Sequence, residues 1–376
     1  MKEVLRPEKS RPEKSMDTLS RLMVRAYCER STKTSPHDRQ QWEQDLRYVV
    51  ALSPAELSDF YQLADANHVL IRALRVLHDA AVEWQEPRIQ AWCDSSLAAE
   101  GARIGHGIEV LHSICTAFES RGCSVAVIKS LDHWPDLGSD FDLYTSAEEK
   151  RVEQVMREEF RAHPVARSWG DRLANKWNYS VPGLPELVEI HVQFLGQTGE
   201  HAELATRVIT RRVPKVVEGH TFLVPAPEER IVISALQRVY RHFYYRLCDM
   251  IDMAVLCQAE NVRFDQLRET ADLAGIWPGV ATFLALMQAY VNAYGGQVSL
   301  PADVLASACM RQNNVRFGNG FLRVSKITGA KLYGSQLIAA SRQLNLRALS
   351  RLPLLPPLAI SALVAHRLTG NDKGIW

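Results

Sequence analysis

The sequence lacks closely spaced pairs of cysteines. The seven cysteines are Cys28, Cys93, Cys115, Cys123, Cys248, Cys257 and Cys309. No two of them form a Cys-x-x-Cys pair, and their number is odd. A scattered, odd set in a chain of this length is typical of free thiols in a reducing compartment. We therefore expect most of these cysteines to act as small buried hydrophobic residues.

Long apolar runs are also missing. The longest, at residues 352–363, is interrupted by Pro353, Pro356 and Pro357, and it is too short to cross a bilayer. The N-terminus is charged and lacks the apolar segment of a signal peptide. These two observations predict a cytoplasmic protein without a transmembrane segment.

The chain has no overall excess of charge. It carries 44 Lys and Arg against 43 Asp and Glu, for a net charge of +1. A general nucleic-acid-binding protein normally has a large positive excess, so nucleic acid is a less favoured partner. Residues 305–371, however, contain nine Lys and Arg and no acidic residue. This basic segment either binds an acidic peptide, nucleic acid or anionic lipid, or forms a solvated basic face.

The length and the apolar content favour two or three packed units with a sizeable core. Residues 6–15 consist of Arg-Pro-Glu-Lys-Ser repeated twice, and this proline-containing, charged repeat predicts a disordered tail over residues 1–15. Residues 16–120 then show helical spacing of apolar residues. Within them, Ser53-Pro54 followed by Glu56 is typical of a helix start.

The spacing changes to that of strands in residues 121–225. Short strands are predicted at 124–129, 140–144, 177–181, 187–194 and 221–224, with a helix at 147–160. Helical spacing resumes in residues 226–376, with one long helix predicted at 228–257 and others at 264–274, 280–294, 302–311 and 332–349. The expected fold class is α+β, in which a small mixed sheet is flanked by N-terminal and C-terminal helical regions.

Two carboxylates at alternate positions of a predicted strand give the main functional signal. Side chains at positions i and i+2 of a strand point to the same face, so Asp140 and Asp142 can address a common point. Mg²⁺ prefers such oxygen ligands, and paired ions can activate a hydroxyl and stabilise a departing pyrophosphate. Glu189, in a later strand, is the candidate third carboxylate. An Asp-x-Asp pair alone is more typical of a solvated loop, but the flanking strands favour a site.

These residues also carry a resemblance. Val127-Ile128-Lys129, followed by Asp140-Phe141-Asp142-Leu143, resembles the apolar-Lys-Gly and Asp-Ile-Asp-Leu elements of the uncharacterised nucleotidyltransferase family, in the polymerase-β-like superfamily. Glu189-Ile190-His191-Val192 and Ile251-Asp252-Met253-Ala254 resemble two later elements of that family, so the resemblance covers roughly residues 66–259. Where the family has glycine after the lysine, this sequence has Ser130.

The resemblance implies an enzyme that transfers a nucleoside monophosphate from a nucleoside triphosphate, ATP being the best candidate, to a hydroxyl or phosphate acceptor. Asp140, Asp142 and Glu189 would bind Mg²⁺, and Glu189 could also be the general base. Lys129 would bind phosphate oxygens, with Ser130, Ser139 and His191 beside them. A peptide or protein acceptor is suggested by analogy alone, and small-molecule or RNA transfer is the second interpretation. The alternative of another class is a catalytically silent binding protein with a degenerate phosphate site.

Further candidates lie in the predicted long helix. Helical spacing would place Arg238, Arg241 and Tyr245 on one stripe that could hold the base and the triphosphate, or could simply pack. Asp252 lies on a mostly apolar segment, so we expect a structural ion pair with Arg246 or Arg241, the alternative being a side chain that faces the site. The linker residues Asp132 and Asp136 are expected to be solvated.

Overall fold

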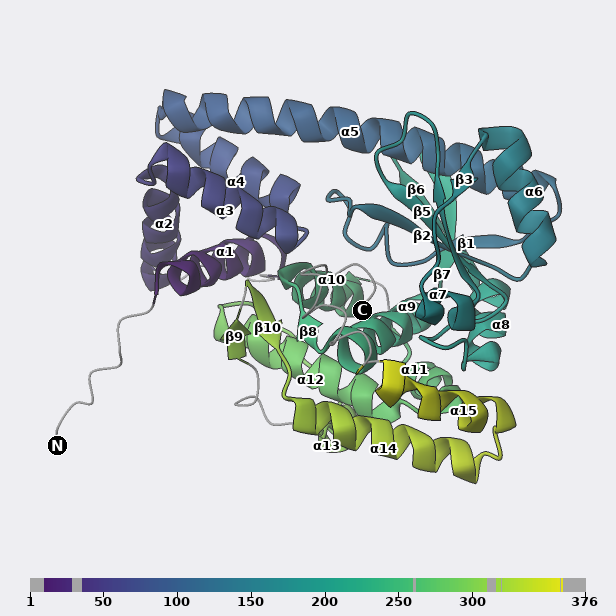
Figure 1. Cartoon of the computed structure of the whole chain (residues 1–376). Helices are drawn as coiled ribbons and strands as arrows, with labels where there is room; N and C mark the ends of the chain where they lie inside the picture. The colour runs from purple at the N-terminus through teal and green to yellow at the C-terminus, as the bar shows by residue number, and fades with distance from the viewer. Residues whose placement is uncertain are drawn as a thin grey trace.

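The computed structural model describes residues 10–28, 36–259, 262–309, 316–318, 320–358 and 360. A five-stranded mixed sheet lies among helices that precede and follow it in the chain, so the predicted α+β class is confirmed (Figure 1). No helix of the described residues is long and apolar enough to cross a membrane. All seven cysteines are free thiols, as predicted.

The N-terminal helices are α1 (Arg11–Cys28), α2 (Pro36–Val50), α3 (Pro54–Ala66), α4 (Leu70–Glu83) and α5 (Pro87–Ser120). The predicted start of α3 is confirmed, because Ser53 and Glu56 form a reciprocal capping box. The predicted tail is wrong for residues 11–15, which begin α1, while residues 1–9 lie outside the described residues. Those first-turn residues are anchored by tertiary contacts: Arg11 pairs with Glu56 at 2.6 Å.

The central sheet consists of β1 (Val125–Val127), β2 (Asp140–Thr145), β3 (His163–Pro164), β4 (Lys176–Ser180) and β5 (Leu187–Val192), in the order β1-β2-β5-β4-β3. Strands β2 and β5 are parallel, and the other pairs are antiparallel. Helices α6 (Glu149–Phe160) and α7 (Trp169–Ala174) lie between strands in the chain. Four of the five predicted strands correspond to β1, β2, β4 and β5, and the fifth corresponds to β7 of a separate hairpin.

Alternation along the strands separates a core face from a polar face. Phe141 and Leu143 of β2, with Val188 and Ile190 of β5, are completely buried in a core with the C-terminal part of α5. The intervening residues Asp142, Glu189 and His191 therefore point to the opposite face of the sheet. After β5 the chain forms α8 (Ala202–Thr210) and the hairpin of β6 (Arg212–Val217) and β7 (His220–Pro225).

The predicted single helix at 228–257 is wrong. The chain instead forms α9 (Pro227–Ala235), the π-helical segment η1 (Leu236–His242), β8 (Tyr244–Tyr245) and α10 (Leu247–Ala259). The helix ends at Phe243, which adopts a left-handed conformation (φ 57°) and donates its N–H to the carbonyl of Arg238. Strand β8 then pairs with β10 (Phe321–Arg323), which also pairs with β9 (Arg316–Gly318).

The remaining elements are α11 (Phe264–Leu273), α12 (Trp277–Ala293), α13 (Ala302–Ser307), α14 (Lys326–Arg342), α15 (Leu346–Arg351) and a 3-10 turn (Leu352–Leu354). The predicted helix at 332–349 is divided at Leu344, whose φ is 52°. In the basic segment, Arg347 and Arg351 donate to the backbone carbonyls of Gly199 and Leu173. These two arginines therefore dock on the protein, whereas Arg311 and Arg367 lie outside the described residues.

Two large hydrophobic cores hold the described part of the chain together, and a small third cluster joins α14 to α15. The larger one joins α1, α3 and α4 to the C-terminal helices α9, α10 and α12, so the first and last helical regions share a core. The smaller one lies beneath the sheet. Helix α5 belongs to both: Ile89 and Cys93 pack in the larger core, and Ile108 and Phe118 pack in the smaller one. In Figure 1 this single helix runs from the N-terminal helices to the sheet.

Candidate active site

An open cavity lies between the polar face of the sheet and the C-terminal helical region. The space between its walls, including the solvent at its mouth, is about 770 Å³. The lining residues are His68, Lys129, Ser130, His133, Gly138, Ser139, Asp140, Asp142, Lys176, Glu189, Gln237, Arg238, Arg241, His242 and Arg246. Almost all of them are polar, so the cavity suits a charged ligand.

Carboxylates from two adjacent strands form one wall. Asp142 of β2 and Glu189 of β5 are direct neighbours in the parallel register, and each is 7 % exposed. Asp140 precedes Asp142 by two positions and lines the same cavity. Local sequence explains this placement, because the apolar residues between the acids are drawn into the core on the other face. The three predicted metal-binding carboxylates are thus on one wall.

Asp142, Glu189 and His191 form the tightest donor group on this wall. One ligand atom of each lies within 4.8 Å of the others. His191 Nε2 is 3.0 Å from Glu189 Oε1, and Lys129 makes an ion pair with Asp142. Two carboxylates beside an imidazole make a donor set that can hold a divalent cation, and the oxygens are the ligands that Mg²⁺ prefers. Asp140 lies outside this tight group.

Lys176 is a site residue that the sequence interpretation missed. It is the first residue of β4, it faces His191 in the antiparallel register, and its Nζ donates to Glu189 Oε2 at 2.9 Å. Asp171 also contacts the Lys176 ammonium, at 2.9 Å. The strand pattern would have shown which face carries Lys176. The order of the strands, which makes it a neighbour of Glu189, could not be read from the sequence.

The carboxylates of this wall differ in their ionisation. Burial and the neighbouring charges of Asp142 and Glu189 raise the pKa of Asp140 to about 6. Burial also opposes the charged form of Glu189, but Lys176, the hydrogen bond from His191 and Lys129 outweigh it and hold the pKa of Glu189 well below its usual range. Glu189 is therefore ionised at neutral pH, as a metal ligand must be.

Arginines form the opposite wall. Gln237, Arg238, Arg241 and His242 come from the π-helical segment η1, and Arg246 lies just before α10. Arg238 is 2 % exposed and pairs with Asp249 at 2.8 Å. Within the part of the chain that the structure describes, neither Arg241 nor Arg246 has a carboxylate within ion-pair distance. Two cations without an anionic partner in a cavity favour the binding of an anion such as phosphate.

The loop that carries Lys129 and Ser130 joins the two walls. Lys129 follows β1 with a left-handed backbone (φ 67°). The Ser130 hydroxyl accepts from the backbone N–H of Asp142 at 2.7 Å and lies 3.4 Å from the carbonyl of Asp140. Ser130 thus fastens this loop to β2, a role that the sequence interpretation did not include. Ser139 lines the cavity next to Asp140.

The predicted stripe of Arg238, Arg241 and Tyr245 does not exist. Tyr245 is completely buried in β8, where its ring stacks on Phe283 with centroids 5.4 Å apart, and it is not among the cavity residues. The reason is the end of the helix at Phe243, which breaks the helical spacing. Tyr245 is therefore removed from the candidate ligand-binding residues, whereas Arg241 remains.

The acidic residues outside the wall were predicted with mixed success. Asp252 makes a structural ion pair, as expected, but its partner is Arg72 at 2.6 Å rather than Arg241 or Arg246. Asp136 is buried against the same Arg72 at 2.7 Å. Asp132 pairs with Arg230 at 2.6 Å. The expectation that the two linker aspartates are solvated was therefore wrong.

No protein-family model and no curated protein matches the chain. Among solved structures, the antibiotic-resistance factor ANT(2'')-Ia is similar with a TM-score of 0.33 and 11% identity, over 44% of this chain and 90% of that one. An antigenic nucleotidyltransferase-like protein from Paracoccidioides brasiliensis is similar with a TM-score of 0.33 and 15% identity, over 51% of this chain and 93% of that one. Similarity at this level assigns no family, so a functional assignment has to rest on the cavity itself.

Proposed function

We propose that the chain is a Mg²⁺-dependent nucleotidyltransferase, which moves a nucleoside monophosphate from a nucleoside triphosphate to a hydroxyl or phosphate acceptor and releases pyrophosphate. One observation carries the proposal: a single cavity has carboxylates on one wall and, on the other, Arg241 and Arg246, which have no carboxylate partner among the described residues. A triphosphate with its metal needs both, because the cation requires oxygen ligands and the phosphate oxygens require positive charge.

Each wall has a separate task. Asp142 and Glu189 hold the metal together with Asp140, and bound Mg²⁺ supplies charge neutralisation and activation of the attacking oxygen. Lys176 and His191 orient Glu189 through the bonds described above. Arg241 and Arg246 bind the phosphates, and Lys129, which pairs with Asp142, lines the same cavity. Catalysis then consists mainly of positioning and electrostatic stabilisation.

An apolar pocket beside the cavity supplies the remaining space. It shares Lys129, Gln237 and Arg241 with the cavity. Its other lining residues include Ile128, Leu195, Ile233, Leu236 and Tyr240. A flat, weakly polar group suits such surroundings. We assign this pocket to the nucleobase or to the apolar part of the acceptor, ATP being the first donor to try and a peptide or protein the first acceptor.

The decisive experiment uses ATP labelled on either the α- or the γ-phosphate, with Mg²⁺, the purified chain and a cell extract. Nucleotidyl transfer moves the α-label to an acceptor, whereas kinase chemistry moves the γ-label. Asp142→Asn is expected to abolish the transfer, and Asp59→Asn, a change of an exposed aspartate in α3, is expected to keep it. Protease or ribonuclease treatment of the labelled product then identifies the acceptor class.

A binding titration separates the enzyme from a silent binding protein. Mg-ATP is expected to bind, and Asp142→Asn and Arg241→Ala are each expected to weaken the binding. Binding without any transfer of the α-label would support the silent protein. No binding, or binding unchanged in Asp142→Asn, would contradict the enzyme. If RNA is the acceptor, RNA affinity must fall steeply with salt.

A further inference from the structure

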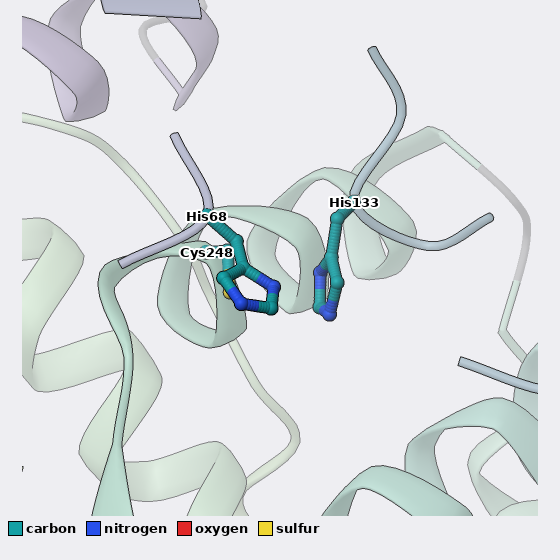
Figure 2. A group of neighbouring side chains, drawn as sticks. All are labelled: His68, His133 and Cys248. Atoms are coloured by element: carbon teal, nitrogen blue, oxygen red, sulfur yellow. The ribbon is translucent and has the colours of Figure 1, made fainter. Parts of the chain in front are cut away.

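A second group of donor side chains lies on the same cavity and shares no residue with the group of Asp142, Glu189 and His191. It consists of His68, His133 and Cys248, and one ligand atom of each lies within 4.8 Å of the others. Figure 2 shows the two imidazole rings side by side, with Cys248 on the helix behind His68. The ring centroids are 5.3 Å apart and the ring planes are nearly perpendicular. Nothing in the proposed nucleotidyl transfer uses these three residues.

The three residues come from segments that are distant in the sequence. His68 lies in the turn between α3 and α4, His133 in the linker between β1 and β2, and Cys248 in the first turn of α10. His68 has a left-handed backbone (φ 51°), a conformation that is costly for residues other than glycine. Its carbonyl accepts a hydrogen bond from Arg72 at 2.8 Å, which helps to hold that conformation.

A carboxylate orients one of the imidazoles. Nδ1 of His133 is 2.6 Å from Oδ2 of Asp252, and the other oxygen of Asp252 accepts from Arg72 at 2.6 Å. A histidine that binds a metal through one ring nitrogen normally gives the other to a carboxylate in this way. The arrangement fixes the orientation of the His133 ring and leaves Nε2 as the ring nitrogen that can bind a metal. This support is independent of the proximity of the three ligand atoms.

The charges around the group are closely balanced. Arg72 pairs with both Asp136 and Asp252, and Arg238 pairs with Asp249. A divalent cation held by one thiolate and two neutral imidazoles would add a net charge of +1 to these surroundings. Arg246, whose Nη1 is 3.5 Å from Nδ1 of His68, favours an anion as the remaining ligand. His68 and His133 line the cavity, so that ligand would come from the cavity.

We propose that His68, His133 and Cys248 bind a Zn²⁺ ion whose fourth coordination position faces the cavity. Thiolate and imidazole donors select zinc, whereas the carboxylates of the other wall select magnesium. Three protein ligands with one exchangeable position are typical of zinc sites that contact a substrate. The ion also connects the α3–α4 turn, the β1–β2 linker and α10, so that its binding stabilises the fold.

Metal analysis tests the proposal on the full chain, prepared without a polyhistidine tag and dialysed against metal-free buffer. About one zinc ion per chain is expected. Cys248→Ala and His133→Ala are expected to lower the zinc content on the order of tenfold or more. Cys93→Ala, which removes another fully buried thiol, and Asp142→Asn, on the carboxylate wall, are expected to keep it.

Cobalt(II) gives a second readout that needs no variant. The unmodified chain, refilled with Co²⁺, is expected to show the thiolate-to-cobalt absorption band and the visible bands of a tetrahedral site. Absence of these bands in protein that is folded by circular dichroism would overturn the proposal. Zinc that is lost in Asp142→Asn but kept in Cys248→Ala would overturn it too, because the ion would then belong to the carboxylate wall.

Discussion

Asp140 is a carboxylate of the cavity whose ionisation is opposed by its surroundings. Its raised pKa, about 6, comes from burial and from Asp142 and Glu189. An aspartate in the unfolded chain titrates near 3.9. The folded state therefore binds this proton more tightly than the unfolded state, and stability falls as the pH rises from that value through about 6.

The first prediction follows from this sign. In EDTA at pH 7.5, Asp140→Asn is expected to raise the free energy of unfolding by roughly 1–3 kcal/mol, since the uncharged amide removes the repulsion. At pH 4 the gain should largely disappear, because Asp140 is then protonated in the folded state. Chemical denaturation at both pH values measures this, and an equal gain at both would contradict it. The same variant should lose nucleotidyl transfer.

Arg72 is a buried arginine that contacts two carboxylates. It is 3 % exposed, and its guanidinium bridges Asp136 and Asp252. Arg72→Met would leave two buried carboxylates without their cation, and we expect a loss of about 3–5 kcal/mol in urea unfolding. Arg39→Ala, which breaks an exposed pair with Glu43, should change the stability by about 0–1 kcal/mol. Similar losses in the two variants would refute this assignment.

At this scale the sequence was informative about faces but not about partners. Alternation in β2 and β5 placed Asp140, Asp142 and Glu189 on one face, because that depends only on neighbouring residues. Arg72, the partner of Asp252, lies 180 positions away in the sequence. Lys176 contacts Glu189 because β4 pairs with β5 in the sheet. Both depend on tertiary structure, which single-sequence spacing does not record.

Among the elements, the segment between α9 and α10 differs most from its prediction. Its apolar spacing is helical throughout, yet the chain forms a π-helical turn and leaves the helix at Phe243. The carbonyl of Phe243 accepts from the backbone N–H of Val324 at 2.9 Å, so a distant segment stabilises the break. π-helical turns are rare and are frequently found at functional sites, and here the turn carries four cavity residues.

A glycine of α12 tests how this segment is supported. A Cβ on Gly279 would lie 2.3 Å from the Tyr240 ring, which lines the apolar pocket. Gly279→Ala is therefore expected to displace Tyr240, lower the melting temperature and weaken nucleotide or acceptor binding. Gly101→Ala in α5 is the control, because no atom lies within 4 Å of its added Cβ. That variant should gain about 0.5–1 kcal/mol from helix propensity. An equal gain in Gly279→Ala would contradict the displacement.

For the whole molecule, the order of the regions was predictable and their packing was not. Apolar periodicity gave the sequence of helical, mixed and helical regions, because periodicity is a local signal. It could not show that the first and last regions share one core, which joins residues as distant as Met16 and Leu332. The cavity could not be predicted either, because its two walls come from different regions of the chain and meet only through their packing.

A ligand that contacts both walls should stabilise the entire chain. Mg-ATP at 100 times its dissociation constant is expected to add about 2.7 kcal/mol to the free energy of unfolding, because it binds only the folded state. Differential scanning calorimetry with and without Mg-ATP measures this gain. EDTA or Asp142→Asn should abolish the gain. A stabilisation by ATP that persists in EDTA would show that the carboxylate wall is not involved.

The length of helix α5 also determines how the residues that face one core are rotated, about the helix axis, relative to those that face the other core. Its 34 residues form one continuous rod of roughly 51 Å, so that removing a single residue rotates one end against the other by about 100°. Deletion of the exposed Ala99 would turn Ile108 and Phe118 away from the sheet while Ile89 stays in place. We expect this deletion to abolish cooperative unfolding in calorimetry, whereas Ala99→Lys should change the stability by less than about 0.5 kcal/mol. The number of residues in α5 is thus fixed, even at exposed positions where the type of residue can change.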